Sequence, residues 1–160
     1  MLLRLETSGI EYCEQPLARW DLDGFRHLRE RVSIPIMADE SVFDHHDAFK
    51  LTAGGCCDYL NIKLAKSGGI HMALKINAVA EASGSKCMLG CMMETRLGLT
   101  AAAHLASARP NIRYLDLDGH FQLQIRSLAA PAGRGRRSPC PMNRASAQPW
   151  TLPSSRNVSR

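Results

Sequence analysis

The chain has 160 residues, of which 45% are hydrophobic, and a formal net charge of +5. This length predicts a domain of ordinary size, and this composition excludes a wholly disordered chain. The sequence has no apolar run of about 18 residues, the length that spans a bilayer, and it does not start with a basic region followed by an apolar stretch. We therefore expect a cytoplasmic protein that neither crosses a membrane nor carries a secretory leader.

Positive charge is concentrated in residues 122–160. This segment contains seven Arg, five of the eight Pro and six Ser but no Lys, Asp or Glu, whereas residues 1–121 contain 13 Lys and Arg against 15 Asp and Glu. The composition predicts a disordered tail, and the abrupt change near residue 121 also fits translation in a wrong reading frame. A non-catalytic basic module acting through this tail is an alternative function. Trp150 is its only aromatic residue, however, and nucleic acid is not the partner we expect.

Short apolar segments alternate with amphipathic segments along residues 1–121. The predicted strands are 10–13, 35–38, 59–63, 86–89 and 112–115. The predicted helices are 21–31, 44–52, 70–83 and 97–108. Successive residues that end the strands lie 24 to 27 positions apart, and this regular alternation predicts a parallel sheet with right-handed crossovers.

Two architectures fit this alternation, an open doubly wound sheet and part of a (β/α)8 barrel. In the barrel, catalytic residues lie at the C-terminal ends of several strands. The sequence places Glu14, Asp39, Lys63 and Asp116 at such ends. We therefore expect an α/β fold that forms part of a TIM-type (β/α)8 barrel.

Three of these residues suggest a metal-assisted proton transfer. Glu14 and Asp39 end adjacent predicted strands, and carboxylates are ligands that Mg²⁺ prefers, although helix capping is the alternative role. Lys63 ends an apolar strand, where burial and a nearby cation would favour its neutral form and let it act as a general base. An ion-paired Lys63 is the alternative, and Lys66 is interpreted as a loop charge.

Other polar residues give weaker signals. Asp116 and Asp118 lie two residues apart after the last predicted strand, where they could bind a substrate ammonium group or form a turn and a helix cap. Cys87 and Cys91 form a C-x3-C spacing with no second pair, which predicts free thiols rather than a zinc site.

Five motifs in order resemble the enolase superfamily: YCEQPL, PIMADESVF, DYLNIKLAKSGGI, MLGCMMETRLGLTAAAHLA and YLDLDG. The resemblance covers roughly residues 3–121 and is strongest to the muconate-lactonizing subgroup with its dipeptide epimerases of the L-Ala-D/L-Glu type. It implies a modified (β/α)8 barrel with a separate α+β capping domain. It also implies Mg²⁺-dependent removal of a proton α to a carboxylate, through an enolate.

The same resemblance assigns roles to single residues. It implies that Glu14 and Asp39 are the second and third metal ligands and that Lys63 is the acid/base lysine. It further implies that Asp116 and Asp118 hold the ammonium group of a dipeptide. This D-x-D pair favours a dipeptide epimerase over a cycloisomerase or an o-succinylbenzoate synthase-like enzyme, which remain alternatives.

The resemblance also predicts what the chain lacks. The five units correspond to strands four to eight of the family barrel, so we expect a fragment without the first three strands and the capping domain. A K-x-K lysine and the first metal-binding aspartate would be missing with them. One base cannot complete a two-base epimerisation, so we expect this chain alone to be inactive as an epimerase. Pairing of exposed sheet edges between two chains, giving a homo-oligomer, is a further alternative.

Overall fold

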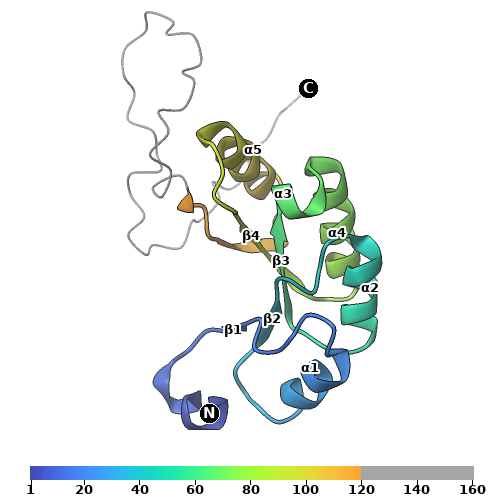
Figure 1. Ribbon diagram of the computed structural model, residues 1–160, viewed down its shortest axis with the longest axis vertical. Coiled ribbons are helices and arrows are strands. Elements are labelled where there is room, and N and C mark those ends of the chain that lie inside the picture. Colours follow the sequence, from blue (N-terminus) through green and yellow to red (C-terminus); the bar gives the residue numbers. More distant parts are fainter. Residues whose placement is uncertain (120–160) are drawn as a thin grey trace, which may run out of the picture. The chain divides into compact units, whose positions relative to one another are not determined.

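The computed structural model describes residues 1–119 (Figure 1), and the predicted tail 122–160 lies outside them. Five strands form one sheet: β1 (Cys13–Glu14), β2 (Ile36–Ala38), β3 (Tyr59–Lys63), β4 (Lys86–Gly90) and β5 (Ile112–Leu115). The helices are α1 (Leu22–Arg29), α2 (His45–Ala53), α3 (Leu64–Ser67), α4 (Ile70–Ala82) and α5 (Arg96–Ser107). Within residues 1–119, none of them is long and apolar enough to cross a membrane.

The strands are ordered β1-β2-β3-β4-β5, and each is parallel to its neighbours. A doubly wound sheet contains a point at which the strand order reverses, and the described strands contain no such point. The parallel order therefore fits a segment of a barrel, as predicted. It also places the C-terminal ends of all five strands at one edge of the sheet.

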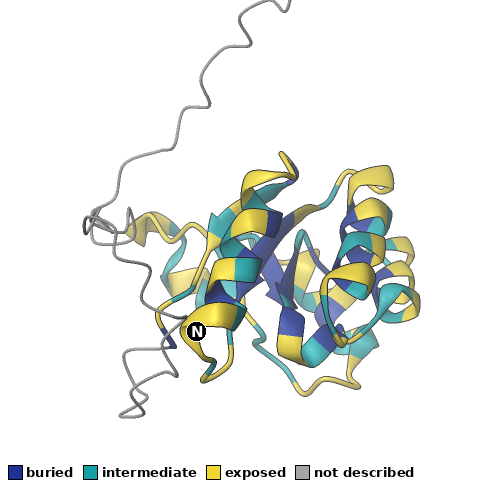
Figure 2. Ribbon diagram, turned by 90° about the horizontal axis from the view of Figure 1, so that it is seen from above, coloured by how far each residue is buried: buried dark blue, intermediate teal, exposed yellow. Residues whose placement is uncertain are grey.

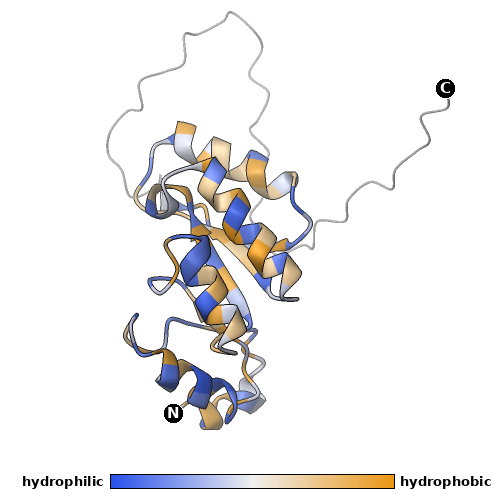
Figure 3. Cartoon of the chain, turned by 90° about the vertical axis from the view of Figure 1, so that its right-hand side faces the viewer, coloured by the Kyte–Doolittle hydropathy of each residue, from blue (hydrophilic) through white to orange (hydrophobic). Residues whose placement is uncertain are grey.

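The helices and the sheet share one apolar core. Leu60 and Ile62 of β3 are fully buried in it, together with Phe25 of α1 and Ile76 of α4. Figure 2 shows buried strands at the centre and exposed outer faces of the helices. Figure 3 shows the matching hydropathy, with hydrophilic and hydrophobic residues on each helix. The apolar spacing of the helices thus places one side of each helix against the sheet.

Side-chain caps fix where three of the helices begin. Asp21 accepts a hydrogen bond from the backbone N–H of Gly24 at the start of α1. Asp44 accepts from two backbone N–H groups at the start of α2. Thr95 begins α5 in the same way. These caps satisfy N–H groups that have no partner within the helix.

Two elements differ from the prediction by more than a shift of one or two residues at an end. The first strand covers Cys13–Glu14 rather than 10–13, because pairing with β2 begins only at Cys13. Ile10 is 38% exposed. The helix α3 was not predicted. It is a single turn between β3 and Gly68, whose φ of +81° is a left-handed conformation that ends the turn.

The cysteines are free thiols in the described chain. Cys56, Cys57 and Cys87 are buried, whereas Cys13 and Cys91 are partly exposed. Burial raises the pKa of both Cys57 and Cys87 to about 12. These two thiols therefore stay protonated at neutral pH and act as small apolar groups in the core.

The face of the sheet opposite Leu60 and Ile62 is polar and aromatic. Side chains alternate along a strand, so Tyr59, Asn61 and Lys63 share this opposite face. The ring of Tyr59 lies near those of Tyr12 and Tyr114 toward the N-terminal ends of the strands. Glu14, Asp39 and Lys63 lie at the C-terminal ends of β1, β2 and β3.

Candidate active site

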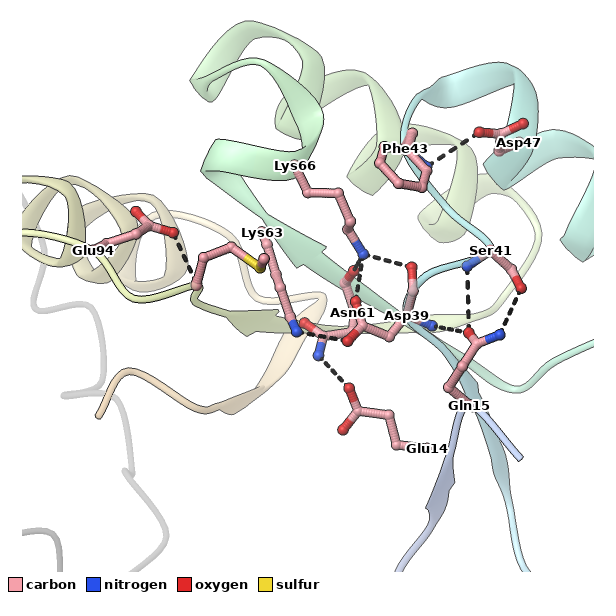
Figure 4. Close-up of polar contacts among 11 residues, drawn as sticks. Glu14, Gln15, Asp39, Ser41, Phe43, Asp47, Asn61, Lys63, Lys66 and Glu94 are labelled. Carbon is pink, nitrogen blue, oxygen red and sulfur yellow. Dashed lines mark hydrogen bonds and ion pairs between the residues drawn. The ribbon is translucent and has the colours of Figure 1, made fainter. Parts of the chain in front are cut away.

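Glu14, Asp39 and Lys63 converge at the C-terminal ends of β1, β2 and β3 (Figure 4). The Lys63 Nζ atom donates a hydrogen bond to Asp39 Oδ2 over 2.6 Å. The Glu14 and Asp39 carboxylates are close enough for each to alter the pKa of the other. The structure thus brings together the three residues that the sequence singled out for metal and proton chemistry.

Lys66 also binds Asp39, which corrects its interpretation as a loop charge. Its Nζ atom donates to Asp39 Oδ1 and to the backbone carbonyl oxygens of Asp39 and Asn61, over 2.6, 2.5 and 2.9 Å. Only 6% of the Lys66 side chain is exposed. The turn of α3 directs the side chain back over the strand ends, because Lys66 lies three residues after the end of β3.

The two lysines determine the charge state of Asp39. Burial alone would raise the pKa of Asp39, but the hydrogen bonds from Lys63 and Lys66 outweigh burial and lower it. Burial would likewise lower the pKa of Lys63, yet the hydrogen bond and charge of Asp39 outweigh burial and raise it. The structure therefore has the ion-paired Lys63 that the sequence left as an alternative, with its Nζ atom 2.6 Å from Asp39 Oδ2. The neutral Lys63 was predicted for a site that holds a cation.

Glu14 responds differently because no ammonium group within residues 1–119 forms an ion pair with it. Burial raises its pKa, the hydrogen bond from Asn61 lowers it, and the nearby Asp39 raises it again, so the net shift is upward. The Asn61 Nδ2 atom donates to Glu14 Oε1 over 2.7 Å. Glu14 is therefore the more easily protonated of the two carboxylates.

Gln15 ties the ends of β1 and β2 together. Its Oε1 atom accepts hydrogen bonds from the backbone N–H groups of Asp39 and Ser41, and its Nε2 atom donates to Ser41 Oγ and to the Leu17 carbonyl oxygen. Gln15 has a φ of +40°, the one left-handed non-glycine conformation among the described residues. Through these hydrogen bonds, the strained Gln15 fixes the position of the end of β1, which carries Glu14, relative to the end of β2, which Asp39 follows.

Asp116 and Asp118 follow β5, where the sequence placed them. Both are exposed, and the Asp116 backbone N–H donates to the Leu89 carbonyl oxygen. Burial and the neighbouring Asp118 raise the pKa of Asp116, while Lys63 lowers it. Asp116 is thus within electrostatic reach of Lys63, but neither aspartate forms an ion pair in the described chain.

Sequence reasoning missed three polar residues of this cluster, Gln15, Asn61 and Lys66. Asn61 carried a usable signal, because it is the polar residue within an otherwise apolar strand and shares a strand face with Lys63. Gln15 and Lys66 carried no such signal, since their burial depends on backbone groups contributed by neighbouring strands and loops.

Glu14 and Asp39 could supply some of the ligands that a divalent cation needs. Glu14 and Asp39 offer hard oxygen atoms from adjacent strands, and Mg²⁺ is commonly held by one or two carboxylates together with water and substrate. No group of three or more His, Cys, Asp or Glu side chains at metal-binding spacing occurs within residues 1–119. The described residues would therefore supply two protein ligands.

A cavity also lies at the other end of the sheet, away from the candidate site. Its volume is about 480 Å³, and it is lined by Glu11, Tyr59, Lys86, Arg113 and Tyr114, toward the N-terminal ends of the strands. It contains none of the converging carboxylates. We place the candidate site at the C-terminal ends, because perturbed titratable groups gather there and parallel barrels carry their chemistry at that end.

A family model described as enolase C-terminal domain-like matches residues 1–133. The chain belongs to this family. The hydrophobic dipeptide epimerase of Enterococcus faecalis is 53% identical over 121 residues, which are 75% of this chain and 34% of that enzyme. The L-Ala-D/L-Glu epimerase of Clostridium acetobutylicum is 51% identical over 120 residues, which are 74% of this chain and 34% of the relative. The chain thus spans about a third of the length of these relatives.

Solved structures of dipeptide epimerases are also similar to this chain. The dipeptide epimerase of E. faecalis in complex with Mg and the dipeptide L-Leu-L-Tyr has a TM-score of 0.74 and 51% identity, covering 76% of this chain and 35% of that one. The epimerase of Cytophaga hutchinsonii with Mg and D-Ala-L-Val has the same TM-score and 40% identity, covering 78% and 34%. These matches confirm the resemblance to the enolase superfamily and the partial barrel.

Proposed function

We propose that this chain carries one part of a Mg²⁺-dependent active site that epimerises a dipeptide by removing a proton α to a carboxylate. The observation that carries the proposal is the convergence of Glu14, Asp39 and Lys63 at neighbouring strand ends. The relatives of known activity, which are dipeptide epimerases, support the choice of reaction.

The described residues have separate roles in this proposal. Glu14 and Asp39 hold the cation, and Lys63 takes the α-proton from one face of the substrate. Asp116 and Asp118 hold the ammonium group of the dipeptide, and the raised pKa of Asp116 fits a carboxylate that lacks a cationic partner. Lys66 stays bound to Asp39 Oδ1 and is not the base, because its three acceptors occupy its ammonium group.

Mg²⁺ at Glu14 and Asp39 would offset the negative charge that develops on the substrate carboxylate. It would also weaken the electrostatic attraction between Asp39 and the Lys63 ammonium group, which favours loss of a proton from Lys63. Lys63 must lose that proton before it can act as a base. With one base on one face, the chain removes the proton of one epimer and returns a proton from solvent to the same face. The result is isotope exchange with retention of configuration.

The experiment is deuterium exchange in heavy water with Mg²⁺. L-Ala-L-Glu and L-Ala-D-Glu are incubated separately with the full chain, and the Glu α-proton is followed by proton NMR. We expect exchange in one epimer, without conversion to the other. The Lys63→Met variant should abolish the exchange, whereas Lys75→Met, which removes an exposed lysine of α4, should retain it.

Two results would contradict the proposal. A chain that is folded by circular dichroism but exchanges neither dipeptide has no independent proton-transfer activity. Exchange that survives Lys63→Met assigns the base to another residue.

A further inference from the structure

Asn61 lies on β3, beside the two strands whose ends carry the carboxylates. It is fully buried and reaches Glu14 on β1, so its side chain spans the intervening strand β2. A carboxylate oxygen can only accept a hydrogen bond, which requires the Nδ2 group of the amide to face Glu14. The orientation of the Asn61 amide is therefore fixed by chemistry.

The other half of the same amide is unsatisfied. Asn61 Oδ1 is buried and has no hydrogen-bond partner among the described residues. A buried carbonyl oxygen without a partner costs about 1–3 kcal/mol. Asn61 therefore lowers the stability of this face of the sheet. The interaction that Asn61 makes with another side chain is its hydrogen bond to Glu14.

Gly90 leaves the space that the Asn61 amide occupies. Gly90 is the register partner of Lys63 on β4. A Cβ atom at Gly90 would lie 2.6 Å from Asn61 Oδ1 and 3.0 Å from Asn61 Nδ2. An alanine there would crowd the amide without any change at Asn61 itself, and its Cβ atom would also lie 3.1 Å from Lys63 Cε.

From these contacts we infer that Asn61 is a positioning residue, which holds the Glu14 carboxylate beside Asp39 for a divalent cation. The inference rests on the proposed function. Glu14 needs such a partner more than Asp39 does, because two lysines and the Gln15 amide already fix Asp39. The bond from Asn61 is the hydrogen bond that fixes the exposed Glu14 side chain in the described chain.

The test measures Mn²⁺ binding to the full chain by electron paramagnetic resonance, with Mn²⁺ as the probe for the cation. Removing a residue that orients a metal ligand typically weakens metal binding about 10- to 100-fold. We expect this loss for Asn61→Leu and for Gly90→Ala. Asn77→Leu is the matched control, because Asn77 on α4 is also buried with an unpaired Oδ1 but lies in a helix.

Thermal unfolding separates positioning from a purely structural role. Asn61→Leu removes a buried unpaired oxygen, so the melting temperature should stay equal or rise while Mn²⁺ binding weakens. Asn61→Leu with unchanged Mn²⁺ affinity would overturn the inference. A loss of affinity shared by Asn77→Leu would also overturn it.

A wild-type chain that binds no Mn²⁺ contradicts the proposed function instead. In that case the side-chain amide of Asn61, observed by proton–nitrogen NMR without metal, decides the inference. Glu14→Ala should shift the Asn61 amide protons and speed their exchange with solvent. Amide signals unaffected by Glu14→Ala would mean that Asn61 does not hold Glu14.

Discussion

Lys66 and Asp39 form a buried ion pair in which the Lys66 ammonium group binds both the side chain and the backbone carbonyl oxygen of Asp39. The Nζ atom lies 2.6 Å from Oδ1 of the side chain and 2.5 Å from the backbone carbonyl oxygen. Both side chains are only 6% exposed. The carboxylate therefore has one oxygen held by Lys66 and the other directed toward Lys63.

Replacing Lys66 should destabilise the fold strongly. Lys66→Met leaves Asp39 Oδ1 and two backbone carbonyl oxygens without this donor, and breaking a buried pair by removing one partner typically costs about 3–5 kcal/mol. Urea unfolding at neutral pH measures this change. Lys75→Met on the exposed side of α4 should change the free energy of unfolding by less than about 0.5 kcal/mol. A similar small effect for Lys66→Met would show that the pair contributes little.

Glu14 should make the metal-free chain less stable as the pH rises. Its pKa is raised in the folded state, so its favourable contribution is full below the unfolded value of about 4.3 and is lost as pH rises through the folded pKa. Glu14→Gln should therefore stabilise the chain at pH 7 and leave its stability unchanged near pH 3. Unfolding in urea across this pH range, with a chelator present, measures the difference. A stability gain that is equal at both pH values would contradict the raised pKa.

Two phenylalanines on neighbouring helices test the location of the core. Phe25 of α1 is fully buried, whereas Phe49 of α2 is 64% exposed. Phe25→Ala should lower the free energy of unfolding by about 3–5 kcal/mol, since it opens a cavity beneath the sheet. Phe49→Ala should change it by less than about 0.5 kcal/mol. Chemical denaturation of both variants makes the comparison, and equal losses would argue against this packing.

The sequence predicted most of the fold because apolar periodicity reflects burial. The strands at 59–63 and 112–115 have the predicted bounds, and the other long elements differ at their ends. The first strand was placed too early, since an apolar Ile10 resembles a strand residue although 38% of it stays exposed. A single helical turn such as Leu64–Ser67 is too short to show any periodicity.

The candidate site was predicted less completely than the fold. Spacing along the chain located Glu14, Asp39 and Lys63, because strand ends in a parallel sheet meet at one edge. The same spacing could not show that Asp39 would raise the pKa of Lys63, since that depends on a single interatomic distance. The burial of Lys66 likewise depends on acceptors contributed by two different strands or their ends.

The sequential strand order has a consequence for synthesis on the ribosome. Among the described strands, each of β2 to β5 pairs with the one made just before it, so this part of the sheet grows at one edge as the chain emerges. Translation adds roughly 5–20 residues per second, whereas a helix forms in about a microsecond or less. Each unit of 24 to 27 residues can therefore dock on its predecessor before the next one is complete. The growing edge is then a template that each newly made strand extends.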